Sequence, residues 1–63
     1  MNRLKELRCL KGLTQYKLAE LTGTYQTKIW LIENEYYAPK EHEKQTLAKI
    51  LNVDVNDIFP DVS

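Results

Sequence analysis

The chain has 63 residues, of which 43% are apolar, and its nine basic side chains balance nine acidic ones. A chain of about 60 residues buries only about 60% of the surface that it exposes when unfolded, so the sequence predicts one small domain, residues 1–63, and excludes a second. No apolar run reaches the roughly 18 residues of a membrane span and no signal peptide is recognisable, so a soluble, cytoplasmic protein without a membrane partner is expected.

Glycine residues separate two short helices in the first third of the chain. Apolar residues recur at helical spacing from residue 4 to about residue 11, where Gly12 can end a helix because it tolerates a positive φ. Thr14 is the expected N-cap of a second helix, and Gly23 is its expected end. The inward face of this second helix is expected to consist of Leu18, Ala19 and Leu21.

A third helix of about nine residues is expected after the turn at residues 23–24. Ile29 and Ile32 share one face of this helix, which fades into a loop after Asn34. The residue before the helix is Tyr25 rather than a serine or threonine, so Thr24 is the only side chain expected to cap it.

Two more helices are predicted after Pro39. The fourth begins in a charged run and ends with the apolar residues 47–51, which fit one helical face. Asp54, with an acidic residue three positions later, predicts a last turn of helix that buries Ile58 and Phe59. Because no segment has the pattern of a paired strand, the predicted fold is an all-α bundle of five short helices.

The spacing between residues 15 and 33 is typical of a helix-turn-helix motif. Counted from Gln15, the small residue Ala19 is fifth, Gly23 is ninth, and Ile29 and Ile32 are fifteenth and eighteenth. Two short helices that cross at a steep angle need a small residue at their contact and a positive φ in the turn between them. Each residue alone means little, but their combination predicts this motif at about residues 15–34.

On these residues, the chain resembles the phage-repressor and Cro type (XRE-like) of the helix-turn-helix family. The resemblance covers nearly the whole chain, from the first helix through residues 15–33 to the apolar segments near the C-terminus. It implies a five-helix, lambda-repressor-like domain of a prokaryote or phage that binds operator DNA as a homodimer, with the third helix in the major groove.

The resemblance also implies which side chains contact double-stranded DNA. Those expected to face base edges, at the start of the third helix and one turn further on, are Gln26, Thr27, Lys28, Trp30 and Leu31. The resemblance implies phosphate contacts for Gln15 and Asn34. Independently of the resemblance, Lys17, Tyr36 and Tyr37 are further candidates for contacting phosphates.

Gln26 is the strongest candidate for reading a base. Its amide can donate to N7 and accept from N6 of adenine together, a pairing worth about 1 to 3 kcal/mol of discrimination. Thr27 offers a hydroxyl and a methyl group and should contribute less. Gln15 lies beside the free N–H groups of a helix N-terminus, which favour a phosphate oxygen. For both glutamines the alternative is a polar residue on a solvated helix face.

Other candidates have structural interpretations of equal or greater weight. The resemblance implies that Arg8 and Glu33 form an ion pair between the first and third helices rather than contacting DNA, and loss of one partner should cost about 3 kcal/mol. Trp30 points away from the core stripe and either contacts thymine methyl groups or packs against a neighbour. Tyr36 and Tyr37 either touch phosphates or cover the end of the core.

The sequence departs from the family pattern after the third helix. Glu35 occupies a position where the family prefers glycine, so the turn must close differently or strain this residue. Its charge is also expected near the DNA phosphates, which would lower affinity.

Enzyme chemistry has almost no support in the sequence. There is no glycine-rich phosphate loop and no paired nucleophile and base, and the chain is too short to enclose a pocket. Cys9 is expected to behave as a small apolar residue, and with His42 it makes no metal-ligand set. Glu41 and Glu43 are expected to be surface charges that favour the helix dipole. No cofactor, metal or small-molecule ligand is expected.

The function predicted from the sequence is that of a DNA-binding transcriptional regulator that represses by occupying an operator. Because one small module makes few contacts, a twofold dimer is expected, and its interface is placed in the C-terminal segment at Val55, Ile58, Phe59 and Val62. The alternative is a protein-interaction module on the same scaffold, antitoxin-like or anti-repressor, whose anchors would be Trp30, Tyr36 and Tyr37 beside Glu35.

The zero net charge hides an uneven distribution. Residues 1–34 have a net charge of +3, and residues 35–63 have a net charge of −3. The basic half contains the helices expected to contact DNA, so neutrality does not oppose a nucleic-acid partner. The neutral net charge does predict a weak non-specific affinity for DNA.

Overall fold

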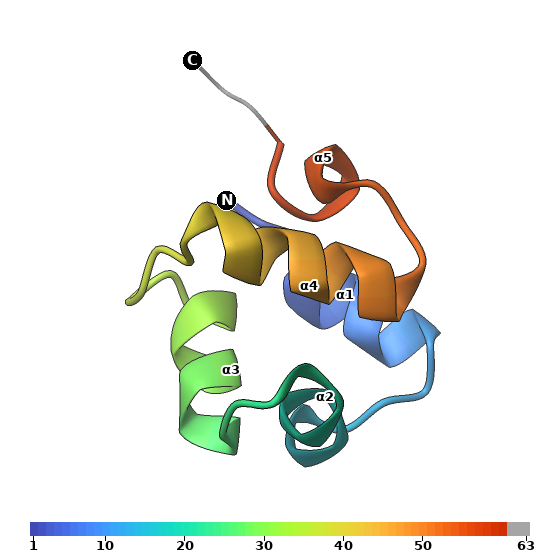
Figure 1. Ribbon diagram of the computed structural model, residues 1–63, viewed down its shortest axis with the longest axis vertical. Coiled ribbons are helices and arrows are strands. Elements are labelled where there is room, and N and C mark those ends of the chain that lie inside the picture. Colours follow the sequence, from blue (N-terminus) through green and yellow to red (C-terminus); the bar gives the residue numbers. More distant parts are fainter. Residues whose placement is uncertain (61–63) are drawn as a thin grey trace.

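The computed structural model describes residues 1–60, and within them all regular structure is helical. The helices are α1 (Leu4–Leu10), α2 (Gln15–Thr22), α3 (Gln26–Glu33), α4 (Glu41–Leu51) and α5 (Val55–Ile58). Figure 1 shows α2 and α3 together at one end of the molecule, α1 and α4 across the middle, and α5 at the opposite end. The all-α fold with five short helices is therefore confirmed.

A single cluster of aliphatic side chains fills the space between the helices. Its fully buried members come from every helix and are Leu4, Leu18, Ile29, Leu51 and Ile58. Each such side chain contributes about 1.5 to 3 kcal/mol by leaving water. The core thereby fixes α2 and α3 against α1 and α4, and leaves the opposite face of α3 in solvent.

The start and end of α2 form as expected. Thr14 is the N-cap, and its Oγ1 accepts a hydrogen bond from the Lys17 backbone N–H at 2.9 Å. Gly23 follows the helix in the left-handed region with φ 76°, a conformation that costs residues with a Cβ atom about 1 to 2 kcal/mol. The sharp turn into α3 therefore depends on this glycine.

Two sequence expectations about α2 and α3 were wrong. Leu21 is 44% exposed, because it lies about 100° around the helix from Thr22, which shares the inward face with Leu18 and Ala19. The N-cap of α3 is Tyr25, which makes no side-chain capping bond, and Thr24 does not replace it. The Thr24 backbone N–H instead bonds to Ala19 O and closes the end of α2.

The turn after α3 strains Glu35 and attaches it to the N-terminus. Glu35 adopts φ 63°, so the glycine-like conformation is kept without a glycine. Its carboxylate accepts from the Asn2 backbone N–H at 3.2 Å and lies 3.7 Å from the terminal ammonium of Met1. The side-chain amide of Asn2 donates through Nδ2 to the backbone oxygen of Ile32 at 2.9 Å. The Glu35 charge is thus directed at the N-terminus rather than left unpaired.

The strain at Glu35 predicts an unusual order of stability. Glu35→Gly and Glu35→Ala both lose the carboxylate, but only glycine relieves the positive φ, so the glycine variant should be more stable by about 1 kcal/mol. Urea denaturation of the two variants measures this difference. The control is the same pair of substitutions at Glu20, which lies inside α2. There Glu20→Gly should be less stable than Glu20→Ala, because glycine weakens a helix interior by about 1 kcal/mol relative to alanine. Equal stability of the two Glu35 variants would contradict the strain.

The structure corrects one residue of the expected dimer surface, which the sequence places in the C-terminal segment. Ile58 is fully buried in the core, so it offers no area to a second chain. Val55 and Phe59 are only partly buried, and both pack against the core. Val62 lies outside the described residues. Among residues 1–60, no helix combines the length and apolar character needed to cross a membrane.

Candidate nucleic-acid interface

The contact between α2 and α3 positions the outer face of α3. These two helices share the most extensive helix contact in the described part of the chain, and Ala19 lies buried in α2 near their junction. Ile29 and Ile32 hold the inner face of α3 in the core. Residues on the opposite face therefore project from a rigid support.

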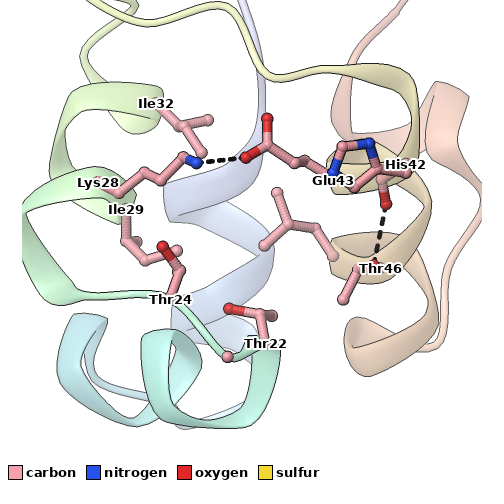
Figure 2. Close-up of a pocket in the computed structure, with 10 residues that line it drawn as sticks. Thr22, Thr24, Lys28, Ile29, Ile32, His42, Glu43 and Thr46 are labelled. Carbon is pink, nitrogen blue, oxygen red and sulfur yellow. Dashed lines mark hydrogen bonds and ion pairs between the residues drawn. The ribbon is translucent and has the colours of Figure 1, made fainter.

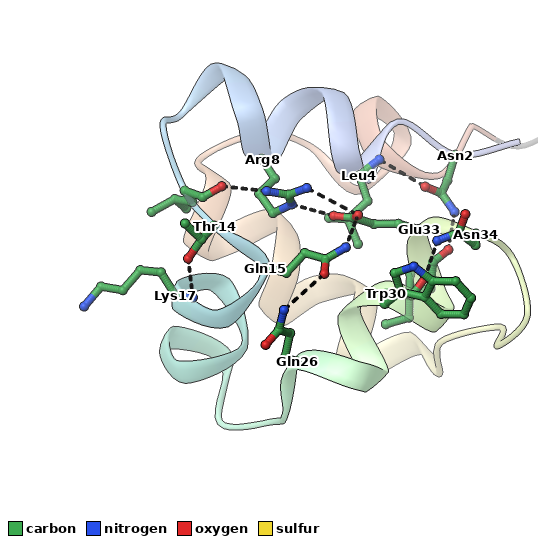
Figure 3. A network of polar contacts seen from close by, with 12 residues as sticks. Asn2, Leu4, Arg8, Thr14, Gln15, Lys17, Gln26, Trp30, Glu33 and Asn34 are labelled. Carbon is green, nitrogen blue, oxygen red and sulfur yellow. Dashed lines mark hydrogen bonds and ion pairs between the residues drawn. The ribbon is translucent and has the colours of Figure 1, made fainter.

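A chain of polar contacts runs from α1 to the first residue of α3. Arg8 Nε donates to Glu33 Oε2 at 2.6 Å, and the Glu33 side chain is only 1% exposed. Glu33 Oε1 also accepts from Gln15 Nε2 at 2.9 Å, and Gln26 Nε2 donates to Gln15 Oε1 at 3.5 Å. Figure 3 shows the two glutamines meeting where α2 and α3 begin.

This chain of contacts fixes the direction of each amide. The Glu33 carboxylate only accepts hydrogen bonds, so Gln15 must turn its NH₂ group toward it and its oxygen toward Gln26. Gln26 donates one of its side-chain N–H groups to Gln15, so its second N–H and its amide oxygen remain available to another partner. Arg8 is held at its other end by donating to Leu13 O at 2.7 Å, and Glu33 raises the Arg8 pKa further.

Most of the side chains expected to contact DNA lie on the exposed faces of α2 and α3. Gln26 and Thr27 are exposed at the start of α3, and Leu31 is partly exposed. Lys17 is exposed on α2, where its ammonium lies 3.0 Å from Glu20 Oε1. Asn34 is exposed after α3, and its Nδ2 donates to Trp30 O at 2.9 Å.

Trp30 and Tyr36 form an exposed aromatic pair at the end of α3. Their ring centroids are 5.6 Å apart and their planes differ by 18°, which is a stacked arrangement. Trp30 is 45% exposed and Tyr36 is 74% exposed. The stacking holds the Trp30 ring against Tyr36, and both rings stay open to solvent.

Lys28 lies apart from these side chains. Its ammonium forms an ion pair with Glu43 of α4 and lies 4.9 Å from the centre of the Tyr37 ring. The Tyr37 hydroxyl donates to Glu43 Oε1 at 2.9 Å. In Figure 2 the Lys28 and Glu43 side chains meet between α3 and α4, beside a pocket of about 200 Å³. Lys28 and Tyr37 thus join α3 to α4 in this structure.

The role of Glu43 was not predicted from the sequence. Besides Lys28 and Tyr37, Glu43 accepts from the Lys40 backbone N–H at 2.8 Å and closes the first turn of α4. The hydrogen bonds from Lys28 and Lys40 lower the Glu43 pKa from 4.5 to about 2. The sequence suggested only a surface charge at a helix start, because no local pattern indicates a partner on another helix.

The lowered Glu43 pKa predicts a pH dependence of stability. Because the folded protein keeps this carboxylate ionised more strongly than the unfolded chain, the stabilisation is complete above about pH 4.5 and is lost as the pH falls toward 2. Glu43→Gln should therefore unfold with a shallower dependence on pH between 4.5 and 2. Thermal denaturation across this range tests the prediction. Glu41→Gln, in the same first turn but exposed, should keep the wild-type slope.

The five-helix fold of residues 1–60, in which a short turn joins α2 to α3, is that of an all-helical helix-turn-helix domain. A family model described as Helix-turn-helix matches residues 4–58. The chain belongs to this family, in its phage-repressor-like form, and the family consists of DNA-binding regulators. An uncharacterized HTH-type transcriptional regulator of Archaeoglobus fulgidus is 30% identical over 57 residues, which cover 90% of this chain and 81% of the relative.

Proposed function

We propose that the protein is a sequence-specific regulator of transcription that binds double-stranded DNA and represses by occupying an operator. The observation that carries the proposal is the pair of hydrogen-bonded glutamines, Gln15 and Gln26, at the exposed starts of α2 and α3. Their anchorage through Glu33 to Arg8 supports an amide with a preset orientation. Preset orientation is what a side chain needs to distinguish one base edge from another.

Gln26 is the proposed base reader. Its free N–H and its oxygen match the N7 acceptor and the N6 donor that adenine presents in the major groove. Thr27, beside it, would contact either an acceptor or a thymine methyl group. Lys28 is not needed for this contact, since its ammonium is paired with Glu43.

The N-terminus of α2 is the proposed phosphate anchor. Its first backbone N–H groups point out of the helix, and Gln15 lies at this end. Lys17 lies in the same first turn, and Asn34 would make a second contact beyond α3. Such contacts fix the position of the protein on the duplex without reading sequence.

A homodimer on two half-sites is part of the proposal. One domain of this size buries little surface on DNA, and two copies related by a twofold axis would read half-sites about one helical turn apart. Because Ile58 is fully buried, it does not contribute to the proposed dimer contact, which would use the partly exposed Val55 and Phe59 or another surface.

Selection from a random duplex pool tests the function. The proposal predicts that the protein retains duplexes with a repeated, inverted half-site containing adenine, and that the selected spacing gives the dimer geometry. Retention of no duplex would overturn it. In that case the exposed Trp30 and Tyr36 would favour the alternative, a protein-interaction module, since exposed aromatic side chains are frequent anchors of protein interfaces.

A further inference from the structure

The outer face of α3 changes character one turn after Gln26. Gln26 and Thr27 present an amide and a hydroxyl, whereas Trp30 presents an indole, and residues three and four apart share one face of a helix. Figure 3 shows Gln26 and Trp30 along the same helix. The expected base reader therefore has an aromatic surface directly beside it.

Tyr36 makes this aromatic surface well defined. It stacks on Trp30 with a centroid separation of 5.6 Å, so the indole has a supporting ring from outside the helix. The backbone below the indole is also held, because Trp30 O accepts from both the backbone N–H and the side-chain amide of Asn34, at 3.0 and 2.9 Å. A large side chain held in this way can contact a ligand with little loss of conformational entropy.

The surroundings of Trp30 favour DNA over a protein as its partner. Gln26, Thr27 and Asn34 on the same exposed side carry polar groups that would need hydrogen-bond partners in a dry protein interface. The major groove offers such partners beside apolar pyrimidine methyl groups. Lys28 of the same helix is turned toward α4, where its ammonium pairs with Glu43, so it does not cover the indole.

We propose that Trp30, supported by Tyr36, reads a pyrimidine 5-methyl group in the major groove. This inference rests on the proposed function and adds a specificity-determining residue to it. Trp30 lies four positions after Gln26, which is about 6 Å along the helix, and stacked base pairs are about 3.4 Å apart. The methyl group therefore lies within about two base pairs of the base that Gln26 contacts.

Replacing thymine by deoxyuridine tests the inference, because it removes only the methyl group. In the selected duplex, each thymine is replaced singly and the affinity of the full chain is measured. One thymine per half-site should show an affinity loss of about fourfold, the value for burial of one methyl-sized group. Trp30→Ala, and Trp30→Gln as a second variant, should bind thymine and deoxyuridine duplexes equally at that position.

Two controls make the result specific. Tyr25→Ala removes another exposed aromatic ring, at the N-cap of α3, and should keep the full methyl dependence. Tyr36→Ala should reduce the methyl dependence, because it removes the ring that supports Trp30. Cytosine and 5-methylcytosine are also compared at the sensitive position. Preference for the methylated form in the wild type but not in Trp30→Ala supports recognition of the methyl group, and equal binding of the two forms by the wild type overturns it.

The outcomes separate this inference from the proposed function. Retention of no duplex overturns the proposed function and the inference with it. Duplex binding without any effect of deoxyuridine, or with an unchanged effect in both Trp30 variants, overturns only the role of Trp30.

Discussion

Arg8→Ala should destabilise the protein by about 3 kcal/mol, because it leaves the carboxylate of Glu33 buried without its cation. The Glu33 side chain is 1% exposed, so water does little to screen its charge in the folded protein. In a domain this small, about 3 kcal/mol lowers the midpoint of thermal unfolding by roughly 12 to 24 °C. Thermal denaturation followed by circular dichroism measures the shift.

A second ion pair at the start of α1, between Arg3 and Glu6, provides a matched control. Both of its side chains are about half exposed, so Arg3→Ala should leave the midpoint nearly unchanged. Replacing Arg8 and Glu33 together by methionine should recover much of the loss, because no buried charge remains. Similar midpoints for Arg8→Ala and Arg3→Ala would contradict the structural role of the buried pair.

Gln26→Ala should reduce the preference for the selected adenine by about 1 to 3 kcal/mol, which is about 5- to 150-fold in relative affinity. The hydrogen bond between the glutamines adds a second expectation. Gln15→Ala should weaken binding to every sequence, through the phosphate, and should also relax the preference for adenine, because Gln26 loses the partner that orients it. Competition binding with duplexes altered at one base pair measures both effects.

Lys17→Ala provides the contrast for these two variants. Lys17 lies in the first turn of α2 but contacts neither glutamine, so its loss should weaken all duplexes alike and leave the base preference intact. An unchanged base preference in Gln26→Ala would exclude Gln26 as the reader.

Much of the fold could be predicted because its determinants are local. The positions of Ala19, Gly23, Ile29 and Ile32 follow from helical periodicity and from the backbone that a tight turn requires. The structure places all of them as that pattern predicts, with Gly23 at a positive φ and both isoleucines buried. Thr14 as N-cap was predictable for the same reason, since a cap bonds within one turn of itself.

The parts that sequence reasoning missed depend on contacts between helices. Glu43 finds Lys28 across the gap between α3 and α4, and no spacing along the chain encodes that meeting. Glu35 could be identified as a strained residue, but its contact with Asn2 depends on how α1 packs against α3. The hydrogen bond from Gln26 to Gln15 likewise depends on the angle between α2 and α3, so the coupling of their roles appears only in the structure.

The salt dependence of binding to duplex DNA shows whether the protein is a DNA-binding regulator. Arg8 and Lys28, two of the basic side chains of α1–α3, are held in ion pairs of low exposure with Glu33 and Glu43, so few phosphates should be neutralised. We expect the protein to bind the selected duplex, and the logarithm of its affinity to fall linearly with the logarithm of the salt concentration, with a slope of about −0.9 for each phosphate contacted. Binding to random duplex should be weaker. Absence of binding to any double-stranded DNA, even at low salt, would contradict the proposed function.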